Sequence, residues 1–117
     1  MGPVRVFHCD DSEAYRVLVR EVLADAPDIE LVGAAGSAQA TLDGVRAVRP
    51  DVVLLDLRGQ DLGPATVGHV RAAVPEARIV VLSGWQGELD TGPIDALVSK
   101  DDALDELVPT IRRVAAR

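Results

Sequence analysis

Five short apolar runs alternate with polar segments along the chain. Residues 51–57 (DVVLLDL) and Arg78–Ser83 (RIVVLS) are almost wholly apolar, a pattern typical of strands buried on both faces of a parallel sheet. Val4–Cys9 (VRVFHC), residues 29–34 (IELVGA) and Ala96–Ser99 (ALVS) predict three further strands. The pattern therefore predicts five strands, of which the third and fourth are central.

Apolar residues between these runs recur at helical spacing. The first predicted helix follows Cys9 and has Asp11 or Ser12 available as its N-cap. Residues 36–48 and 63–74 predict a second and a third helix, each ended by a proline. Strands and helices that alternate at this spacing indicate an α/β fold: a doubly wound, five-stranded parallel sheet with helices on both faces.

The end of the chain predicts one more helix, because residues 104–115 carry an apolar stripe. Pro109 lies inside that stripe, so this helix either begins late or kinks there. The stretch between Ser83 and Lys100 contains three glycines and Pro93, which disfavour helix. A fourth helix between the last two strands is therefore expected to be shortened or missing.

The amino-acid composition limits the classes of protein to which this chain can belong. A length of 117 residues with 48% hydrophobic content fits one domain over 1–117. The net charge of −7 argues against direct nucleic-acid binding. No apolar run is long enough to cross a membrane, and residues 1–8 lack a signal-peptide pattern. The single cysteine, Cys9, excludes an intrachain disulfide and favours a cytoplasmic location.

Polar residues end four of the five predicted strands. Asp10 and Asp11 follow the first, Asp56 ends the third, Ser83 ends the fourth and Lys100 follows the fifth. Ligands bind at the carboxyl ends of strands in such sheets. Three carboxylates close together repel one another, and Mg²⁺ with its preference for oxygen ligands makes the cluster tolerable. Each residue taken alone also has a structural interpretation. Asp10 or Asp11 could cap a helix, Asp56 could be a loop acid, Ser83 a turn residue and Lys100 a solvated charge.

These strand-end residues, in register, resemble the receiver domains of two-component response regulators. The segments that carry the resemblance are RVFHCDDSEAYR, DVVLLDL, RIVVLSG and LVSKDD; with the last stripe, LVPTIRRVAA, they are most similar to the NarL/FixJ subfamily. The resemblance implies a flavodoxin-like (CheY-like) fold with strand order 2-1-3-4-5. It also implies a signalling switch and not an enzyme, since such a domain catalyses only its own phosphorylation and dephosphorylation.

The resemblance assigns roles to individual residues. Asp56 would be the phosphoacceptor, and Ser83 and Lys100 would contact the phosphoryl group once it forms. The implied Mg²⁺ site comprises Asp10, acting largely through water, with Asp11, Asp56 and the backbone carbonyl of Arg58 as direct ligands. The implied partners are a sensor histidine kinase and a C-terminal helix-turn-helix DNA-binding domain outside this chain, which would act in transcription regulation. No membrane partner is implied, and homodimerisation stays open.

Several positions depart from the family. Gly59 and Gln60 replace a Met-Pro pair that usually follows the phosphoacceptor, and Leu97 replaces the usual Tyr or Phe. Trp85 either takes over the role of that aromatic residue or covers the shortened loop. These departures keep a second hypothesis open, in which the chain is an atypical receiver that binds proteins without a phosphoryl cycle. A small hydrolase with an aspartyl phosphate is disfavoured, because Arg58 stands two residues after Asp56 where such enzymes place an acid.

Four other residues have less specific interpretations. Cys9 is expected to be a core residue. His8 and His69 are not spaced as a metal-binding pair, which favours structural roles. Tyr15, on the first predicted helix, either contacts the kinase or packs half-buried against the core.

Overall fold

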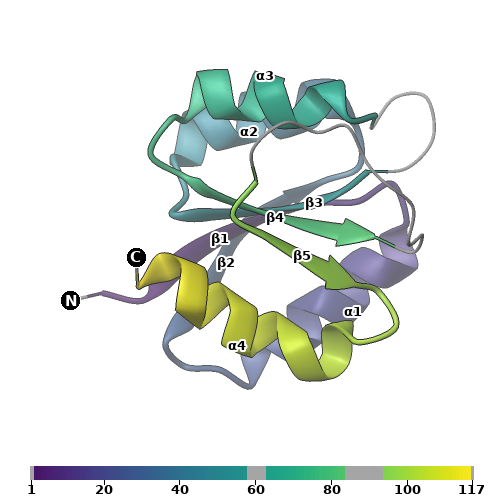
Figure 1. The fold of residues 1–117 in the computed structure, drawn as a ribbon, viewed down its shortest axis with the longest axis vertical. Coiled ribbons are helices and arrows are strands. Elements are labelled where there is room, and N and C mark those ends of the chain that lie inside the picture. Colours follow the sequence, from purple (N-terminus) through teal and green to yellow (C-terminus); the bar gives the residue numbers. More distant parts are fainter. Residues whose placement is uncertain (1, 58–62, 84–93, 117) are drawn as a thin grey trace.

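The computed structural model describes residues 2–57, 63–83 and 94–116. Its strands are β1 (Val4–Cys9), β2 (Ile29–Ala35), β3 (Val52–Asp56), β4 (Arg78–Ser83) and β5 (Ala96–Ser99). Its helices are α1 (Glu13–Ala24), α2 (Ala38–Val48), α3 (Ala65–Ala73) and α4 (Ala103–Ala115). Figure 1 labels these elements along the chain.

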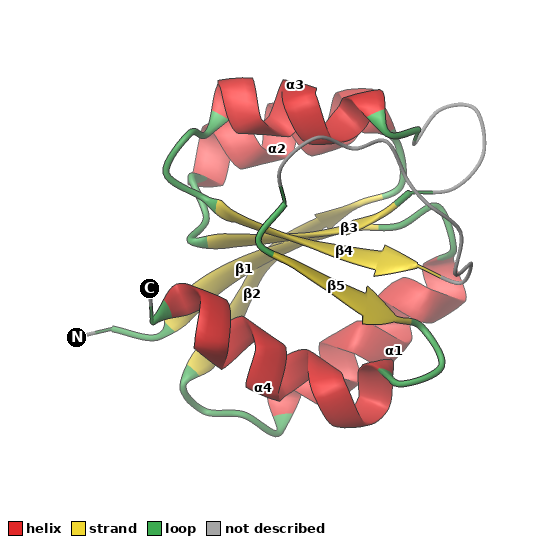
Figure 2. Cartoon of the chain, viewed as in Figure 1, coloured by secondary structure: helices red, strands yellow, loops and turns green. Residues whose placement is uncertain are grey.

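The five strands form one parallel sheet in the order β2-β1-β3-β4-β5. Helices α2 and α3 lie on one face of the sheet, and α1 and α4 lie on the other (Figures 1 and 2). The predicted α/β fold and its strand order are thus confirmed. Because every strand is parallel, all five carboxyl ends meet at one edge of the sheet.

The sheet separates two hydrophobic cores, and β3 contributes to both. Val52 and Leu54 pack with residues of α1 and α4, whereas Val53 and Leu55 pack with residues of α2 and α3. All four side chains are fully buried. Successive side chains of a strand point to opposite faces, so a strand covered on both sides must be apolar throughout. This explains the run DVVLLDL, which ends in a buried carboxylate.

The ring of Phe7 fills the space between β1, β2 and α2. A Cβ atom added to Gly33 would lie 2.8 Å from this ring, and one added to Gly44 would lie 2.5 Å from it. Both distances are far below van der Waals contact. Glycine is therefore required at these two positions because the single phenylalanine of the chain occupies the space of a side chain.

The structure decides two questions about helix ends. Ser12, and not Asp11, is the N-cap of α1, because its hydroxyl accepts a hydrogen bond from the Tyr15 N–H at 3.2 Å. Helix α4 begins at Ala103 and continues through Pro109, so the expectation of a late start is wrong. A smaller correction concerns α3, which spans Ala65–Ala73 with Pro64 as its N-cap, a little shorter than the predicted residues 63–74.

The prediction of a shortened or missing fourth helix concerns residues 84–93, which lie outside the described residues. The described part of the chain holds four helices, and the last of them is α4.

Candidate functional site

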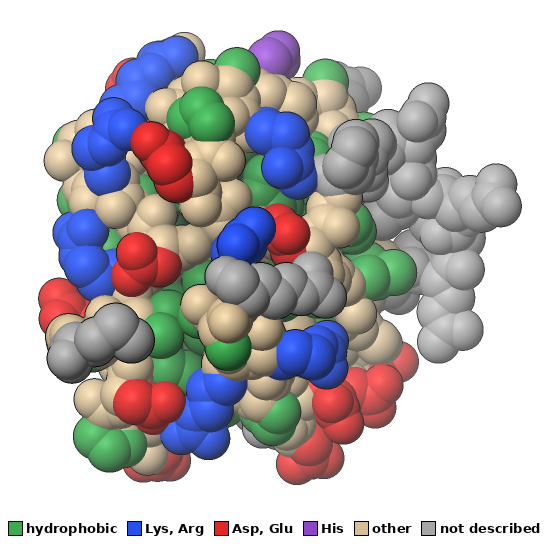
Figure 3. All heavy atoms as spheres, turned by 60° about the vertical axis from the view of Figure 1, so that its left-hand side comes forward, with side chains coloured by type: hydrophobic (Ala, Val, Ile, Leu, Met, Phe, Trp, Pro, Cys, Tyr) green, Lys and Arg blue, Asp and Glu red, His purple; other side chains and the backbone are tan. Residues whose placement is uncertain are grey.

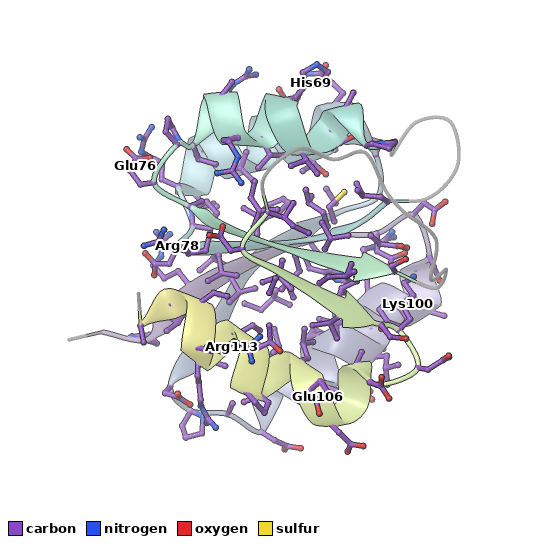
Figure 4. The ribbon with its side chains drawn as sticks, viewed as in Figure 1. His69, Glu76, Arg78, Lys100, Glu106 and Arg113 are labelled. Carbon is purple, nitrogen blue, oxygen red and sulfur yellow. The ribbon has the colours of Figure 1, made fainter. Side chains whose placement is uncertain are left out.

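Three of the predicted site residues come from the carboxyl ends of different strands. Asp10 follows β1, Asp56 is the last residue of β3, and Lys100 follows β5. The Lys100 N–H donates to the Ser83 carbonyl at 2.8 Å, which fixes the lysine beside the end of β4. In Figure 4, Lys100 lies at the end of the sheet opposite to Glu76 and Arg78.

The acidic side chains form a cluster around this lysine. One carboxylate oxygen from each of Asp10, Asp11 and Asp56 lies within 4.8 Å of the others. The Lys100 Nζ lies 2.6 Å from Asp56 Oδ2 and 3.2 Å from Asp10 Oδ2. Asp10 is fully buried and Asp56 is 1% exposed, while Asp11 is exposed. The cluster therefore has two buried acids, one buried ammonium and one acid facing solvent.

The two buried carboxyl groups ionise differently. Burial raises the pKa of Asp56 to about 6; the hydrogen bond from Lys100 opposes this rise and the charge of Asp10 adds to it. Burial would also raise the pKa of Asp10, but the Ser12 N–H, Asp56 and Lys100 outweigh it and lower that pKa. Of the two buried acids, Asp56 is therefore the one whose ionised form the folded protein disfavours.

This donor set fits a divalent cation. Carboxylate oxygens that converge from two strands are hard ligands of the kind that Mg²⁺ and Ca²⁺ take. One ammonium does not neutralise three carboxylates, and burial, with a smaller contribution from the charge of Asp10, raises the pKa of Asp56. A divalent ion would favour the ionised form of Asp56. The expected backbone ligand, Arg58, lies outside the described residues.

The side chain and the backbone of Asp10 are both held by residues at the start of α1. Its Oδ1 accepts a hydrogen bond from the Ser12 N–H at 2.8 Å, and its carbonyl accepts one from Arg16 Nη1. A Cβ atom on Gly36 would lie 2.8 Å from the same guanidinium nitrogen. The loops after β1 and β2 therefore fix the orientation of Asp10 before any ligand binds.

Two aromatic residues at the inner side of the site were assigned other roles from the sequence. The Tyr15 ring centroid lies 4.1 Å from the Lys100 Nζ. His8 is fully buried, with Nε2 3.8 Å from Asp10 Oδ2, and burial lowers its pKa to about 4. The only signal in the sequence for either contact is position: His8 is two residues before Asp10 on β1, and Tyr15 is in the first turn of the next helix.

Of the other predicted residues, Ser83 lies beside the cluster, and the rest lie apart from it or outside the described part of the chain. Ser83 is 8% exposed at the end of β4, beside Lys100. Leu97 on the edge strand β5 is 59% exposed. His69 projects from α3 away from the sheet (Figure 4), so it and the buried His8 do not form a pair. Trp85, Gly59 and Gln60 lie outside the described residues.

A cavity of about 640 Å³ opens at the opposite edge of the sheet. Three arginines and two acids line it: Arg5, Arg49, Arg78, Asp51 and Glu76. Arg49 pairs with Glu76 at 3.3 Å, and Asp51 accepts the Arg5 N–H at 2.9 Å. Figure 3, turned toward this edge, shows positive and negative side chains interspersed. Three arginines and two acids leave one positive charge in excess here, whereas the acidic cluster has an excess of negative charge.

None of the helices in the described residues has the length and apolar character needed to cross a membrane.

Similarity to known proteins gives the class. No protein-family model matches the sequence. The chain is 25% identical over 118 residues to the response regulator protein VraR of Staphylococcus saprophyticus, a match that covers 95% of this chain and 56% of that protein. It is 34% identical over 131 residues to protein-glutamate methylesterase/protein-glutamine glutaminase 5 of Myxococcus xanthus, covering 98% of this chain and 38% of that protein. The chain thus spans about half, or less, of these relatives.

Solved structures agree with the sequence matches. The signal receiver domain of NarL from Mycobacterium tuberculosis superposes with a TM-score of 0.86 at 28% identity, over 99% of this chain and 98% of that one. The response regulator domain of Thermotoga maritima CheB gives a TM-score of 0.86 at 19% identity, over 98% of both chains; at that identity it shows the fold alone. The chain is therefore a response-regulator receiver domain of a two-component system. Within that class it is related to the NarL/LuxR-type regulators.

Proposed function

We propose that this domain, over residues 1–117, accepts a phosphoryl group on Asp56 from a sensor histidine kinase, with Mg²⁺ as cofactor. The observation that carries the proposal is the contact between Lys100 Nζ and Asp56 Oδ2 at 2.6 Å, inside a cluster of three convergent carboxylates. A buried acid held by one ammonium at the carboxyl edge of a parallel sheet is suited to react there with an anionic group.

The chemistry that Asp56 performs is nucleophilic attack. A carboxylate oxygen forms a bond to the phosphorus of a phosphohistidine while the P–N bond breaks, and the electron pair of that bond stays on the imidazole nitrogen. Phosphoryl transfer depends mainly on positioning and on neutralising charge. Lys100, already beside Asp56, would then pair with a phosphoryl oxygen, and the Ser83 hydroxyl would donate to another. Hydrolysis by water would release phosphate and restore the carboxylate.

The residues that would hold Mg²⁺ are Asp10, Asp11, Asp56 and the backbone carbonyl of Arg58. When bound, the ion neutralises charge on the carboxylates and on the phosphoryl oxygens. Asp10 already has two partners, the Ser12 N–H on Oδ1 and Lys100 on Oδ2, which suits the expectation that it acts on the ion through water.

The change of state would be passed to an output in transcription regulation through a helix-turn-helix domain outside this chain. This domain would contact neither DNA nor a membrane itself and would work in the cytoplasm as a switch whose only catalysis is its own phosphorylation and dephosphorylation. One observation favours the alternative, a phosphorylation-independent interaction module. Leu97, at 59% exposure on an edge strand, offers an apolar contact to a partner protein and stands where the family usually has Tyr or Phe.

Phosphorylation by a small donor tests the proposal. The protein is incubated with acetyl phosphate and Mg²⁺ and its intact mass is measured. We expect one added phosphoryl group, which is absent with a chelator and absent in Asp56→Asn. The matched control is Asp51→Asn, which changes the acid at the other end of β3 and should leave the adduct intact.

A further variant tests the role given to the lysine. Lys100→Arg keeps the charge but replaces a compact ammonium by a planar fork, and we expect it to lower the yield of the adduct. Failure of the wild-type protein to gain the phosphoryl group from any donor, or an equal gain in Asp56→Asn, would overturn the proposal. The first of these outcomes would leave the interaction module as the function to pursue.

A further inference from the structure

The ammonium of Lys100 has two different kinds of partner. The carboxylates of Asp56 and Asp10 contact it at 2.6 and 3.2 Å, and the ring of Tyr15 lies 4.1 Å away from it. That separation is well inside the distance of about 6 Å at which a cation is attracted to the face of an aromatic ring. The lysine side chain is 9% exposed, so this attraction is little weakened by water.

The position of the Tyr15 ring is itself tied to the site. The Tyr15 N–H donates to the Ser12 hydroxyl at 3.2 Å, and the Ser12 N–H donates to Asp10 Oδ1 at 2.8 Å. Asp10 Oδ2 then contacts Lys100, and Lys100 contacts the Tyr15 ring. The four residues therefore form a closed circuit of contacts that links the first turn of α1 to the end of β5.

The surroundings of Tyr15 keep its ring in place. Tyr15 is partly buried and packs against the core between the sheet, α1 and α4. Its ring also lies at a tilt beside the imidazole of His8, with 6.2 Å between the ring centroids. A partly buried ring that faces the ammonium has little surface left for a kinase, which favours the packing alternative over the kinase-contact alternative for this residue.

A fixed aromatic ring restrains a lysine side chain, which is flexible by itself. Its ammonium stands on a flexible stem and rotates freely, and in the proposed reaction it must leave the carboxylate of Asp56 for a phosphoryl oxygen nearby. Carboxylates on one side restrain the ammonium only while they are unmodified. The ring restrains it from the other side in both states, because the attraction does not depend on which anion Lys100 contacts.

We propose that Tyr15 is a positioning residue for Lys100: its ring holds the ammonium at the site and so raises the affinity of the domain for the phosphoryl group, without contact between Tyr15 and that group. This inference rests on the proposed function. Its structural part can be tested without any phosphoryl chemistry, because Lys100 is the only lysine of the chain and its side-chain signals need no sequence-specific assignment.

Nuclear magnetic resonance tests the contact directly. In the full chain labelled with ¹³C-lysine, the Hε protons of Lys100 should be shifted upfield by the ring current of Tyr15. The shift should persist in Tyr15→Phe, which keeps the ring and removes the hydroxyl. It should disappear in Tyr15→Leu, which removes the ring. An unshifted Lys100 signal in the wild-type protein would overturn the inference whatever the protein does with phosphate.

Calorimetry tests the consequence. Binding of beryllofluoride, a mimic of the phosphoryl group, is measured with Mg²⁺ for the same three proteins. We expect about 3- to 30-fold weaker binding in Tyr15→Leu, the range that corresponds to loss of a cation–π contact at a partly desolvated site, and near-wild-type binding in Tyr15→Phe. Binding of Mg²⁺ alone should be equal in all three proteins, since the ring contacts the lysine and not the acids; this also shows that Tyr15→Leu is folded.

The outcomes separate the inference from the proposed function. Equal beryllofluoride affinity in Tyr15→Leu and the wild-type protein, with the ring-current shift present, would reduce Tyr15 to a packing residue. Equal losses in Tyr15→Phe and Tyr15→Leu would place the effect on the hydroxyl and also overturn the inference. If the wild-type protein binds Mg²⁺ but not beryllofluoride, the proposed function fails and the positioning role fails with it, although the shift would still report the contact.

Discussion

The burial of the Asp56 carboxylate, with Asp10 beside it, makes a specific prediction about stability: in the absence of divalent ions, Asp56→Asn should stabilise the fold. The folded protein raises the pKa of Asp56 from 3.8 to about 6. A group whose pKa is raised on folding contributes stability below its unfolded pKa and loses it as the pH rises through the folded value. The ionised carboxylate therefore destabilises the fold above pH 6, and a neutral amide of the same shape does not.

The magnitude follows from the shift. About two pH units at about 1.4 kcal/mol each give a penalty of about 3 kcal/mol at pH 7. Solvent screening does not reduce this penalty, because Asp56 is 1% exposed. The attraction of Lys100 is already contained in the shift, since it is one of the causes that oppose it. We therefore expect Asp56→Asn to be more stable than the wild-type protein by about 2 to 3 kcal/mol at pH 7.

Urea unfolding at a series of pH values, with a chelator present, measures this difference. The gain of the variant should grow between pH 4 and 6 and should be near zero at pH 4. Mg²⁺ at saturating concentration should stabilise the wild-type protein more than the variant and so reduce or reverse the difference. Asp51→Asn, just before β3, is the control: its amide oxygen can still accept the Arg5 N–H, so it should stay within about 0.5 kcal/mol of wild type. A variant less stable than wild type at pH 7 without metal would refute the reasoning.

Three further predictions concern other residues. Burial lowers the pKa of His8 to about 4, so the free energy of unfolding of the wild-type protein should fall by up to about 3 kcal/mol as the pH drops from 6.5 toward 4. Urea unfolding of His8→Leu should show no such fall. The same dependence of unfolding free energy on pH in both proteins would contradict the prediction. Gly44→Ala should destabilise the fold by about 1 to 3 kcal/mol because its Cβ would meet the Phe7 ring, whereas Gly68→Ala, with open space around it, should raise the melting temperature; equal melting curves would refute the steric explanation. Asp28 pairs in bidentate fashion with Arg112, so Asp28→Asn should lower the melting temperature at low salt, and the effect should vanish in concentrated salt; a salt-independent loss would point to another cause.

The opposite pH dependences of Asp56 and His8 make the variants necessary. In the wild-type protein, ionisation of Asp56 removes stability as the pH rises from about 4 to 6, while protonation of the unfolded histidine removes it as the pH falls below 6.5. The two effects partly cancel. Each becomes visible only as a difference between the wild-type protein and the variant in which that group is neutral at every pH.

Much of the fold could be predicted because its signals are local in the sequence. The run DVVLLDL can be buried on both faces only as a central strand, and prolines mark the ends of the helices. The exact ends of the helices could not be predicted, because they depend on the geometry of a single helical turn. Asp11 and Ser12 are both good N-caps by composition, and only the hydrogen bond from Tyr15 selects Ser12. Pro109 could have delayed the start of α4, yet the helix begins at Ala103 and runs through the proline, with Leu107, Ile111 and Val114 buried in the core.

In the candidate site, too, some contacts could be predicted from the sequence and others could not. Parallel strands place their last residues at one edge, so the meeting of Asp10, Asp56 and Lys100 followed from their order alone. The contact of Tyr15 with Lys100 did not follow, because it joins side chains 85 positions apart whose orientations are set by a helix cap and by packing. The orientation of His8 toward Asp10 was hidden for a related reason: alternation along β1 places His8 on the face of α1 and α4 but does not say which neighbour its ring approaches.

Mapping the phosphorylated residue tests the central claim most directly. The protein is incubated with acetyl phosphate and Mg²⁺ and reduced with borohydride, which converts an aspartyl phosphate to homoserine, and its peptides are sequenced by mass spectrometry. Homoserine should be found at position 56 and should be absent when the metal is chelated. Reduction at Asp10 or Asp11 instead, or at no aspartate in a protein that binds Mg²⁺, would contradict the assignment of Asp56 as the group that Lys100 holds ready to react.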